Sequence, residues 1–213
     1  MSPSFSSLRS PAFLLTSSSS SDFTDNSARS SDMVTHSEDD FWKNPLFNVK
    51  RFFKLSSKDW ISEVDAVMVK LSRSMKLAGV CVFLPQSMKF MDVKIQLSIH
   101  SITGDVIYHQ EDVIGNLFST RDDKVAEMRI PDGLVLESHR RYYIVTRMAK
   151  AVNRWAGNFG HALHCLETAT GYVLAVFSSV DNNDLEEFLE NFENKSTTQQ
   201  GQIPAINLEE IYL

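Results

Sequence analysis

The stretch that decides the fold is DVKIQLSIHSITGDVIYHQE, residues 92–111. Between Asp92 and Ile99, apolar side chains alternate strictly with polar ones. Because side chains alternate between the two faces of a strand, this pattern predicts a strand with one buried and one solvated face. Thr103-Gly104-Asp105 has the composition of a tight turn, and a second apolar segment follows it. Residues 92–111 are therefore predicted to form an antiparallel β-hairpin.

Several other short segments are rich in Val, Ile and Leu and end at turn residues such as Pro131-Asp132-Gly133. Many short strands without a β-α-β rhythm, about ten in all, are typical of an antiparallel β-sandwich or barrel. The predicted fold class is therefore all-β. The further predicted strands are Ala66–Leu71, Lys76–Leu84, Lys124–Ile130, Tyr142–Met148, Ala162–Leu166, Tyr172–Phe177 and Ile203–Ile206.

Residues 1–40 differ in composition from the rest of the chain. They are rich in Ser, include the run Ser17–Ser21 and show no hydrophobic periodicity. Such a segment cannot bury enough apolar surface to offset the entropy of ordering it. We therefore predict a disordered arm and favour it over a targeting peptide. Residues 41–213 are expected to form one β-domain, which the strand at Ile203–Ile206 closes.

Near the end of this domain, Asn183–Asn194 departs from the strand pattern. Its apolar residues recur at helical spacing among glutamates, and Asp184 is suited to cap a helix. A short helix over residues 184–193 or an irregular acidic loop is expected there. Its apolar stripe either packs on the domain itself or docks into a groove on a partner.

Composition excludes several classes of function. The formal net charge of −6 offers no basic stripe to a nucleic acid. No apolar run approaches the roughly 18 residues that a membrane-spanning helix needs, so no membrane partner is expected. Two cysteines, Cys81 and Cys165, do not make a disulfide framework, which is typical of a reducing compartment. A cytoplasmic location is therefore expected.

Four segments follow one another in the order found in a known family. VKRFFKLSSKDW (Val49–Trp60) resembles the family's opening, an Arg-Phe pair followed by a Trp, and DAVMVKLSRSMKLAGVCVF (Asp65–Phe83) resembles its next two strands. The hairpin of residues 92–111 matches the following pair, and GQIPAINLE (Gly201–Glu209) resembles the closing Gly-Gln-Ile-Pro strand. By these marks, residues 47–209 resemble the PHR domain. That domain is a β-sandwich module of BTB-domain proteins and of the very large highwire-type ubiquitin ligases.

The resemblance implies an antiparallel β-sandwich that binds other proteins and is not an enzyme. The partners that it implies are BTB proteins and components of ubiquitin ligases, for which the chain would be an adaptor or substrate-recognition module. Nothing N-terminal to the matching part resembles a BTB, BACK or RING domain, so a truncated relative that competes with full-length BTB proteins is an alternative. A β-sandwich that binds a small ligand in a concave loop pocket is another.

The richest candidate for a binding segment is AVNRWAGNFGHALHC (Ala151–Cys165), which is expected to be a loop between two strands. Arg and Trp dominate binding hot spots, and glycines permit unusual backbone shapes. We expect this loop to bind a partner, with Trp60 and Asp65 shaping the neighbouring rim. The alternative is that its aromatic side chains fold back onto the edge of the sandwich. The predicted partner-binding residues of the loop are Arg154, Trp155, Gly157, Phe159 and Gly160.

His161, His164 and Cys165 invite a metal or thiol-enzyme interpretation. In a strand, however, His161 and His164 point to opposite faces, and His164 points away from Cys165. A zinc site also needs a fourth ligand, and a nucleophilic thiol needs a base within reach. Cys81 lies in an apolar strand, where a buried small side chain is the default. No metal site, cofactor or catalytic residue is therefore predicted, and a hydrolase would require one of the thiols to be reactive.

Overall fold

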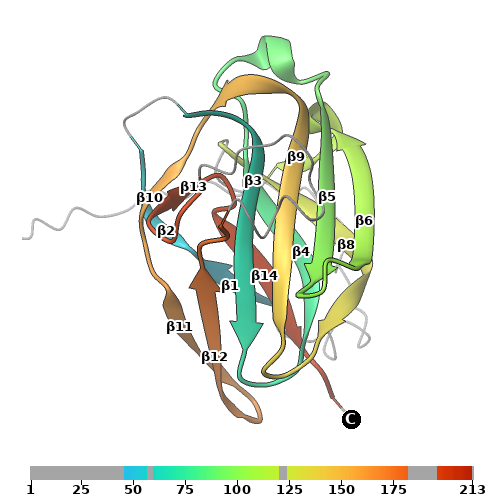
Figure 1. Cartoon of the computed structure of the whole chain (residues 1–213), viewed down its shortest axis with the longest axis vertical. Coiled ribbons are helices and arrows are strands. Elements are labelled where there is room, and N and C mark those ends of the chain that lie inside the picture. The colour runs from blue at the N-terminus through green and yellow to red at the C-terminus, as the bar shows by residue number, and fades with distance from the viewer. Residues whose placement is uncertain (1–45, 57–59, 120–123, 182–195, 213) are drawn as a thin grey trace, which may run out of the picture. The chain divides into compact units, whose positions relative to one another are not determined.

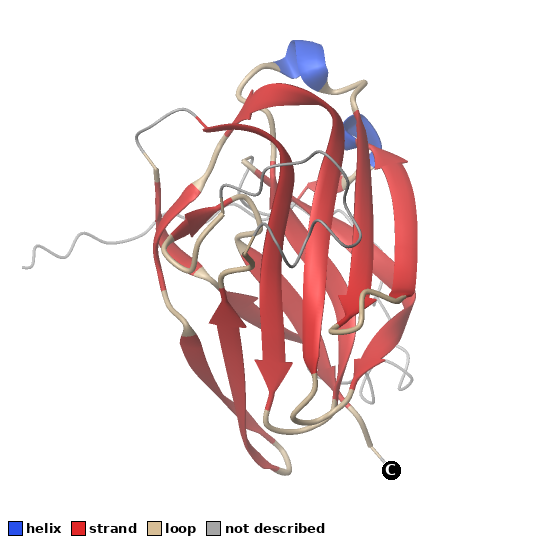
Figure 2. Ribbon diagram, in the orientation of Figure 1, coloured by secondary structure: helices blue, strands red, loops and turns tan. Residues whose placement is uncertain are grey.

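The computed structural model describes residues 46–56, 60–119, 124–181 and 196–212. In these residues the chain forms antiparallel β-sheets and two short 3-10 helices, Met88–Phe90 and Ile114–Asn116 (Figure 2). The predicted all-β antiparallel fold is confirmed, and no helix in this part of the chain is long and apolar enough to cross a membrane. The arm predicted for residues 1–40 and the helix or loop predicted for residues 184–193 lie outside the described residues.

Two sheets form the layers of the sandwich. The first has five strands, which are β1 (Leu46–Lys50), β4 (Met75–Phe83), β7 (Phe118–Ser119), β8 (Val125–Leu136) and β14 (Ala205–Glu210). The second has six strands, which are β3 (Trp60–Leu71), β5 (Lys94–Ser101), β6 (Val106–Val113), β9 (Arg141–Arg154), β11 (Leu163–Thr168) and β12 (Gly171–Ser178). The strand orders are β1-β14-β4-β8-β7 and β11-β12-β3-β9-β5-β6. Figure 1 views the six-stranded sheet in front of the five-stranded one.

A third sheet, which we call the small sheet, lies at one margin of the sandwich (Figure 1). It contains β2 (Phe52–Leu55), β10 (Gly157–Gly160) and β13 (Gln200–Gly201), with β10 in the centre. These strands have two to four residues, too few to show an alternating pattern. They are the main reason why the structure has fourteen strands in its described part where the sequence predicted about ten.

The predicted hairpin is confirmed as β5 and β6, which pair from Lys94↔Val113 to His100↔Val106. Gly104 in its turn has a φ of +85°, a conformation that glycine adopts without steric cost. The apolar residues of β5 face the space between the two large sheets, where they are 0% exposed. One continuous apolar cluster fills this space, and it takes side chains from both sheets. The alternation in the sequence therefore identified the core face of the hairpin correctly.

Several strands extend further than their sequences predict, and β3, β8 and β9 do so by the most residues. β3 begins at Trp60 instead of Ala66, and β9 continues to Arg154 instead of ending at Met148, because the two strands pair through Trp60↔Arg154. β8 continues beyond the predicted turn at residues 131–133, since it pairs with β4 again after a shift in register. Pairing with distant segments thus extends strands where the local sequence does not alternate.

Candidate functional site

The segment expected to be a binding loop is built into strands. Its first residues, up to Arg154, complete β9, and residues 157–160 form β10. β10 pairs with β2 through Asn158↔Lys54 and with β13 through Asn158↔Gln200. Three segments that are distant in sequence therefore meet in the small sheet, and the segment has a fixed backbone where a loop was predicted.

Gly157 and Gly160 are required by close packing. A Cβ added at Gly157 would lie 2.0 Å from Cδ2 of Phe52, and one at Gly160 would lie 2.0 Å from the carbonyl oxygen of Thr198. Both glycines are buried, and neither has a positive φ. The expectation that they give a loop an unusual shape is therefore corrected, because they let neighbouring segments approach the small sheet closely.

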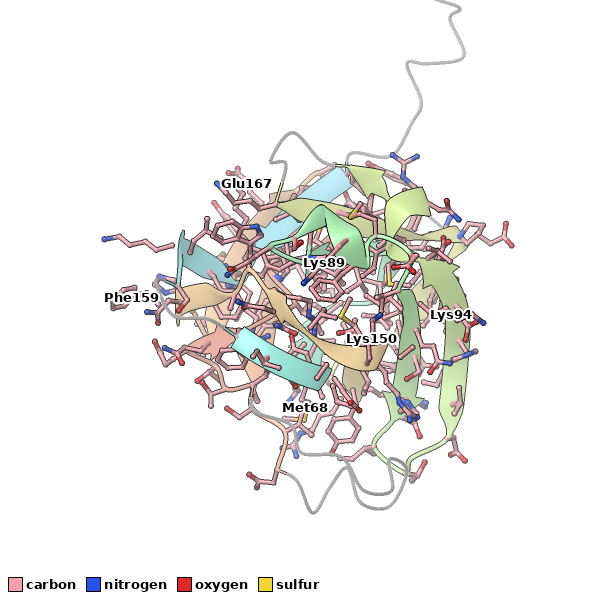
Figure 3. All side chains as sticks on the ribbon, turned by 90° about the horizontal axis from the view of Figure 1, so that it is seen from above. Met68, Lys89, Lys94, Lys150, Phe159 and Glu167 are labelled. Carbon is pink, nitrogen blue, oxygen red and sulfur yellow. The ribbon has the colours of Figure 1, made fainter. Side chains whose placement is uncertain are left out.

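Phe159 lies between these glycines and is the exposed residue of β10. Its side chain is 58% exposed and projects outward at the margin of the molecule in Figure 3. Its φ of +57° is in the left-handed region, which costs a residue with a Cβ about 1–2 kcal/mol. Oδ1 of Asn158 accepts a 2.9 Å hydrogen bond from the Phe159 N–H, and Nζ of Lys54 lies 5.8 Å from the ring centre. The structure thus holds an aromatic ring in solvent at an energetic cost.

Arg154 and Asp65, both predicted to shape the binding surface, are completely buried. Each is 0% exposed, as is Arg51, a residue that the sequence analysis did not select. Asp65 attracts both guanidinium groups electrostatically. We call these three residues the buried charge cluster. The expectation that Arg154 and Asp65 contact a partner is therefore corrected, because no partner can reach side chains in this position.

Burial dominates the electrostatics of the buried charge cluster. It lowers the pKa of Arg51 and of Arg154 to about 10, while the charge of Asp65 acts in the opposite direction. Burial likewise raises the pKa of Asp65, against the attraction of both arginines. In the described part of the chain, no oxygen accepts a hydrogen bond from the guanidinium nitrogens of Arg154, so charge attraction compensates for its burial. Removing Asp65 would leave two buried guanidinium groups without the charge that compensates them.

Arg51 connects the buried charge cluster with the small sheet. Its Nη2 donates a hydrogen bond to the carbonyl oxygen of Thr197, and its backbone N–H donates one of 2.7 Å to the carbonyl oxygen of Pro204. Its own carbonyl oxygen accepts one of 3.0 Å from the N–H of His161. Arg51 lies between β1 and β2, and a single charged residue between two strands gives no periodic signal. The one sequence feature that could have indicated a role for Arg51 is its position in the Arg-Phe pair, which is part of the family resemblance.

The two tryptophans of the predicted site are half-buried. Trp60 is paired with Arg154 across β3 and β9. The Trp155 N–H donates a 3.1 Å hydrogen bond to the carbonyl oxygen of Leu84, and Nζ of Lys124 lies 5.4 Å from the Trp155 ring centre. Of the seven predicted binding residues, Phe159 is exposed, the tryptophans are half-buried and the other four are buried. Phe159 is thus the best placed of them to meet a partner.

The residues considered for a metal or thiol site are not placed as the sequence predicted. His161 lies before β11 and outside any strand, with its ring centre 6.1 Å from that of His164. Among the described residues, no group of three His, Cys, Asp or Glu side chains is arranged to hold a metal ion. Burial, followed by the charge of Glu127, raises the pKa of Cys81 to about 12. Cys81 therefore stays protonated at neutral pH and lacks the thiolate that a nucleophile needs.

A serine–histidine pair that the sequence analysis did not select lies in the β5–β6 hairpin. Nε2 of His100 is 2.8 Å from Oγ of Ser98, and Nδ1 is 3.2 Å from the carbonyl oxygen of Gly104. Because a carbonyl only accepts, Nδ1 donates to Gly104, and in the neutral imidazole Nε2 then accepts from the serine hydroxyl. His100 is 3% exposed, so a substrate cannot reach this pair. Its contacts stabilise the hairpin turn.

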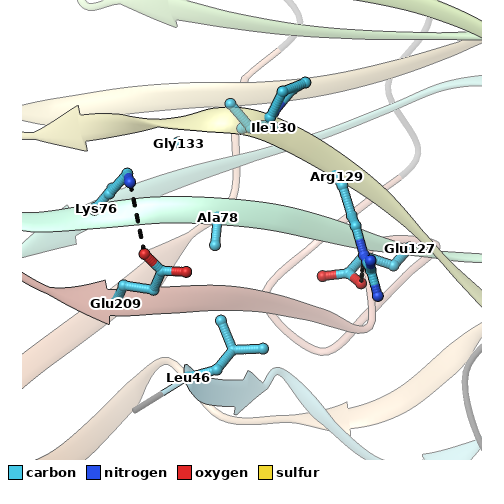
Figure 4. A pocket seen from close by; sticks show the side chains of 9 residues that line it. Leu46, Lys76, Ala78, Glu127, Arg129, Ile130, Gly133 and Glu209 are labelled. Carbon is cyan, nitrogen blue, oxygen red and sulfur yellow. Dashed lines mark hydrogen bonds and ion pairs between the residues drawn. The ribbon is translucent and has the colours of Figure 1, made fainter. Parts of the chain in front are cut away.

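The solvent-facing side of the five-stranded sheet carries a pocket of about 270 Å³ (Figure 4). It lies where residues 130–133 of β8 have no partner in β4, because the register shifts there. Two ion pairs line it, Lys76–Glu209 at 3.7 Å and Arg129–Glu127 at 3.0 Å. Charges that are already paired within the protein select a charged ligand weakly, so this pocket suits a small ligand of mixed polarity.

A comparison with known protein families supports the resemblance that four sequence segments indicated. The family model described as PHR domain matches residues 50–209, which is 160 of the 213 residues. None of the curated proteins searched matches the chain. The matched region contains all three residues of the buried charge cluster and all three strands of the small sheet.

Proposed function

Since the chain belongs to the PHR domain family, we propose that it is a non-catalytic protein-interaction module that anchors its partner through Phe159. A single observation carries this proposal: the ring of Phe159 is 58% exposed on a backbone with a φ of +57°. Strained backbone conformations cluster at functional sites, where the surrounding structure maintains them. Neither the strained backbone nor the exposure of the ring stabilises the fold, which favours a role in binding.

The surroundings of Phe159 support the proposal. Leu55, on the neighbouring strand β2, is 38% exposed and adds apolar surface, while Lys54, Asn158 and Gln200 supply polar groups. An apolar centre with a polar rim is the usual composition of a protein–protein interface. Large aromatic side chains at such centres carry much of the binding free energy.

The packing beneath Phe159 also favours binding. The adjacent glycines leave no space for movement against Phe52 and the carbonyl oxygen of Thr198, and Gln200 donates a 3.3 Å hydrogen bond to Asn158. A backbone that is already fixed loses little conformational freedom when a partner covers the side chain that it carries. The small sheet therefore presents Phe159 as a preorganised anchor.

Within this role we place the chain among the adaptors or substrate-recognition modules of ubiquitin-ligase pathways. The sequence resemblance supports this placement, and BTB proteins and cullin-ligase components are the partners to test. Cys81 and Cys165 are both free thiols, which supports a reducing, cytoplasmic environment.

Affinity capture of the full chain followed by mass spectrometry tests the proposal. Wild type, Phe159→Ala and Val106→Ala are compared, because Val106 is an equally exposed apolar residue, at 60%, on β6. We expect wild type and Val106→Ala to recover the same BTB or cullin-ligase proteins and Phe159→Ala to lose them. Equal recovery by all three baits would show that Phe159 is not the anchor.

A small-ligand function is the second candidate, and the pocket on the five-stranded sheet carries it. A metabolite that binds there would raise the Tm of the wild type by mass action. Ala78 lines the pocket (Figure 4), so Ala78→Leu would fill part of it and remove the shift. A shift that Ala78→Leu leaves unchanged would place the ligand elsewhere.

A further inference from the structure

Strand β11 is the last strand of the six-stranded sheet, at the left margin of the molecule in Figure 1. The Phe177 N–H donates a 2.7 Å hydrogen bond to the carbonyl oxygen of Ala162, opposite it in the register. Hydrogen-bonded pairs recur at every second residue of an antiparallel ladder, so His164 and Leu166 bond to β12. The N–H and C=O groups of Leu163, Cys165 and Glu167 therefore point away from the sheet. No described strand pairs with this edge.

The same residues belong to an exposed apolar surface. The register places Cys165 opposite Leu174 and Glu167 opposite Tyr172, so these side chains share one face with Leu163. Leu163 is 56%, Tyr172 67% and Leu174 41% exposed. An edge strand with apolar side chains beside unpaired backbone groups is a template for pairing with another strand.

β11 also lacks the features that usually protect an edge strand. It contains no Pro or Lys, and its pairing with β12 is continuous from Leu163↔Val176 to Thr168↔Gly171 without a bulge. Its one charged residue is Glu167. Natural edge strands that remain unpaired normally carry such protection, so its absence indicates that this edge is covered.

The hairpin that presents this edge is held firmly at its tip. Arg73 donates hydrogen bonds of 2.8 Å to the carbonyl oxygen and to Oγ1 of Thr170. The carboxylate of Glu210, from the other large sheet, accepts hydrogen bonds from the N–H groups of Ala169 at 3.1 Å and Thr170 at 3.0 Å. The edge is therefore preorganised for pairing.

We propose that β11 pairs antiparallel with β11 of a second copy of this chain, about a two-fold axis at His164 and perpendicular to the sheet. The six-stranded sheets of the two copies then become one continuous sheet. In this register Leu163 of one copy lies opposite Cys165 of the other, and their outward N–H and C=O groups bond to each other.

Strand β11 is complementary to a second copy of itself, and this complementarity determines both the binding partner and the register in which the two strands pair. A two-fold axis perpendicular to the sheet keeps each side chain on its own face, so only axes that pass through a residue are allowed. With the axis at Cys165, Leu163 of one copy would lie opposite the carboxylate of Glu167 of the other. With the axis at Leu166, Cys165 of one copy would lie opposite that carboxylate. The axis at His164 is the one that sets Leu163 against Cys165 and keeps both away from that carboxylate. An axis at Leu163 would oppose Cys165 to His161, whose N–H already donates to the carbonyl oxygen of Arg51. Such isologous pairing is the usual basis of a symmetric dimer.

The first test is the association state of the full chain, measured by sedimentation velocity from low to several hundred micromolar. We expect reversible dimers for wild type and for Cys165→Ser. Cys165→Pro removes an N–H that points out of the sheet, which an edge strand tolerates, and we expect it to be monomeric with an unchanged circular dichroism spectrum. A monomeric wild type at every concentration, or a dimer that survives Cys165→Pro, would overturn the proposal.

Disulfide trapping tests the register. Leu163→Cys places a thiol directly opposite Cys165 of the other copy, about 5.5 Å away between Cα atoms, and we expect an oxidised covalent dimer. The wild-type Cys165 residues would be diagonal neighbours, about 7–8 Å apart, beyond the range of an unstrained disulfide. Tyr172→Cys, on the same face of β12 but one strand from the axis, is the control and should not cross-link. Cross-linking of the wild type, or of Tyr172→Cys as readily as Leu163→Cys, would refute this register.

Discussion

The backbone N–H of Gln202 donates a 2.6 Å hydrogen bond to Oδ2 of Asp65, although 137 residues separate the two in the sequence. This bond ties the segment that enters the last strand to the buried charge cluster. Asp65, Gln202 and Arg51 each belong to one of the segments that carry the resemblance to the PHR domain. These sequence marks therefore converge at one place in the fold, beneath the small sheet.

Asp65→Asn should strongly destabilise the protein. The substitution keeps the shape of the side chain but removes the charge that compensates two buried arginines. Loss of one partner from a buried ionic cluster typically costs about 3–5 kcal/mol. Urea unfolding followed by tryptophan fluorescence measures the free energy of unfolding. Asp132→Asn, at an exposed position, is the matched control and should be nearly neutral, so equal effects of the two variants would contradict a role for the cluster.

Gly160→Ala should destabilise the small sheet. The new Cβ would lie 2.0 Å from the backbone oxygen of Thr198, which cannot rotate away as a side chain does. Overpacking of this kind typically costs about 1–3 kcal/mol. Thermal unfolding should show a lower Tm than that of Gln199→Ala, which alters an exposed side chain on the facing segment. A Tm within error of wild type would mean that the segments are not packed as described.

Phe159→Gly should be more stable than Phe159→Ala by about 1 kcal/mol, because glycine adopts a positive φ without the steric cost of a Cβ. Both variants lose the exposed ring, so both should lose partner binding. Urea unfolding of the pair isolates the backbone contribution. If the alanine variant is the more stable of the two, residue 159 does not have the left-handed conformation.

Alkylation should distinguish the two cysteines. Burial and the charge of Glu127 raise the pKa of Cys81 to about 12, whereas Cys165 is exposed on β11. Iodoacetamide at mildly alkaline pH should therefore add one carbamidomethyl group to the native protein, at Cys165, and two after denaturation. Intact-mass and peptide-mapping spectra give the count and the position. Rapid native labelling of Cys81 would refute its protonated, buried state.

Glu210 should make stability depend on acidic pH. Hydrogen bonds, first from the Thr170 hydroxyl and then from the backbone N–H of Ala169, hold its pKa below the usual value. A carboxylate with a depressed pKa in the folded state stabilises the fold above its unfolded pKa of about 4.3. That contribution is lost as the pH falls through the folded pKa.

The check is a series of Tm measurements from neutral pH to pH 3 on wild type and Glu210→Gln. The difference between the two proteins should be largest near neutral pH and should shrink in acid. Glu137→Gln, which removes an exposed carboxylate, controls for the general effect of one fewer acidic group. A difference that does not vary with pH would show that the charge of Glu210 has no part in holding the hairpin tip.

Local patterns predicted what depends on neighbouring residues. The β5–β6 hairpin follows from the alternation at residues 92–99 and from Gly104 in the turn, because both the burial of one face and the left-handed turn are properties of a short stretch. The small sheet could not be predicted in this way. Its strands exist only because β2, β10 and β13 meet, and each is too short to form alone.

The candidate site shows the same division between what the local sequence predicts and what only tertiary contacts determine. Sequence reasoning selected Phe159 and Arg154 together, since both belong to residue types common at interfaces. Tertiary structure separated them, with Phe159 at 58% and Arg154 at 0% exposed. One charge distant in sequence, that of Asp65, makes the burial of Arg154 tolerable, and no property of residues 151–165 reports its presence.

The sequence by itself determined that this protein is an antiparallel β-domain of the PHR type, with its core on the alternating apolar faces. The tertiary structure alone decided which polar residues turn inward, which glycines are held by close contacts and which aromatic ring remains in solvent. The physical reason is that alternation assigns a residue to a face of its strand, whereas burial depends on what covers that face. Here the cover comes from segments more than a hundred residues away, as between Asp65 and Gln202.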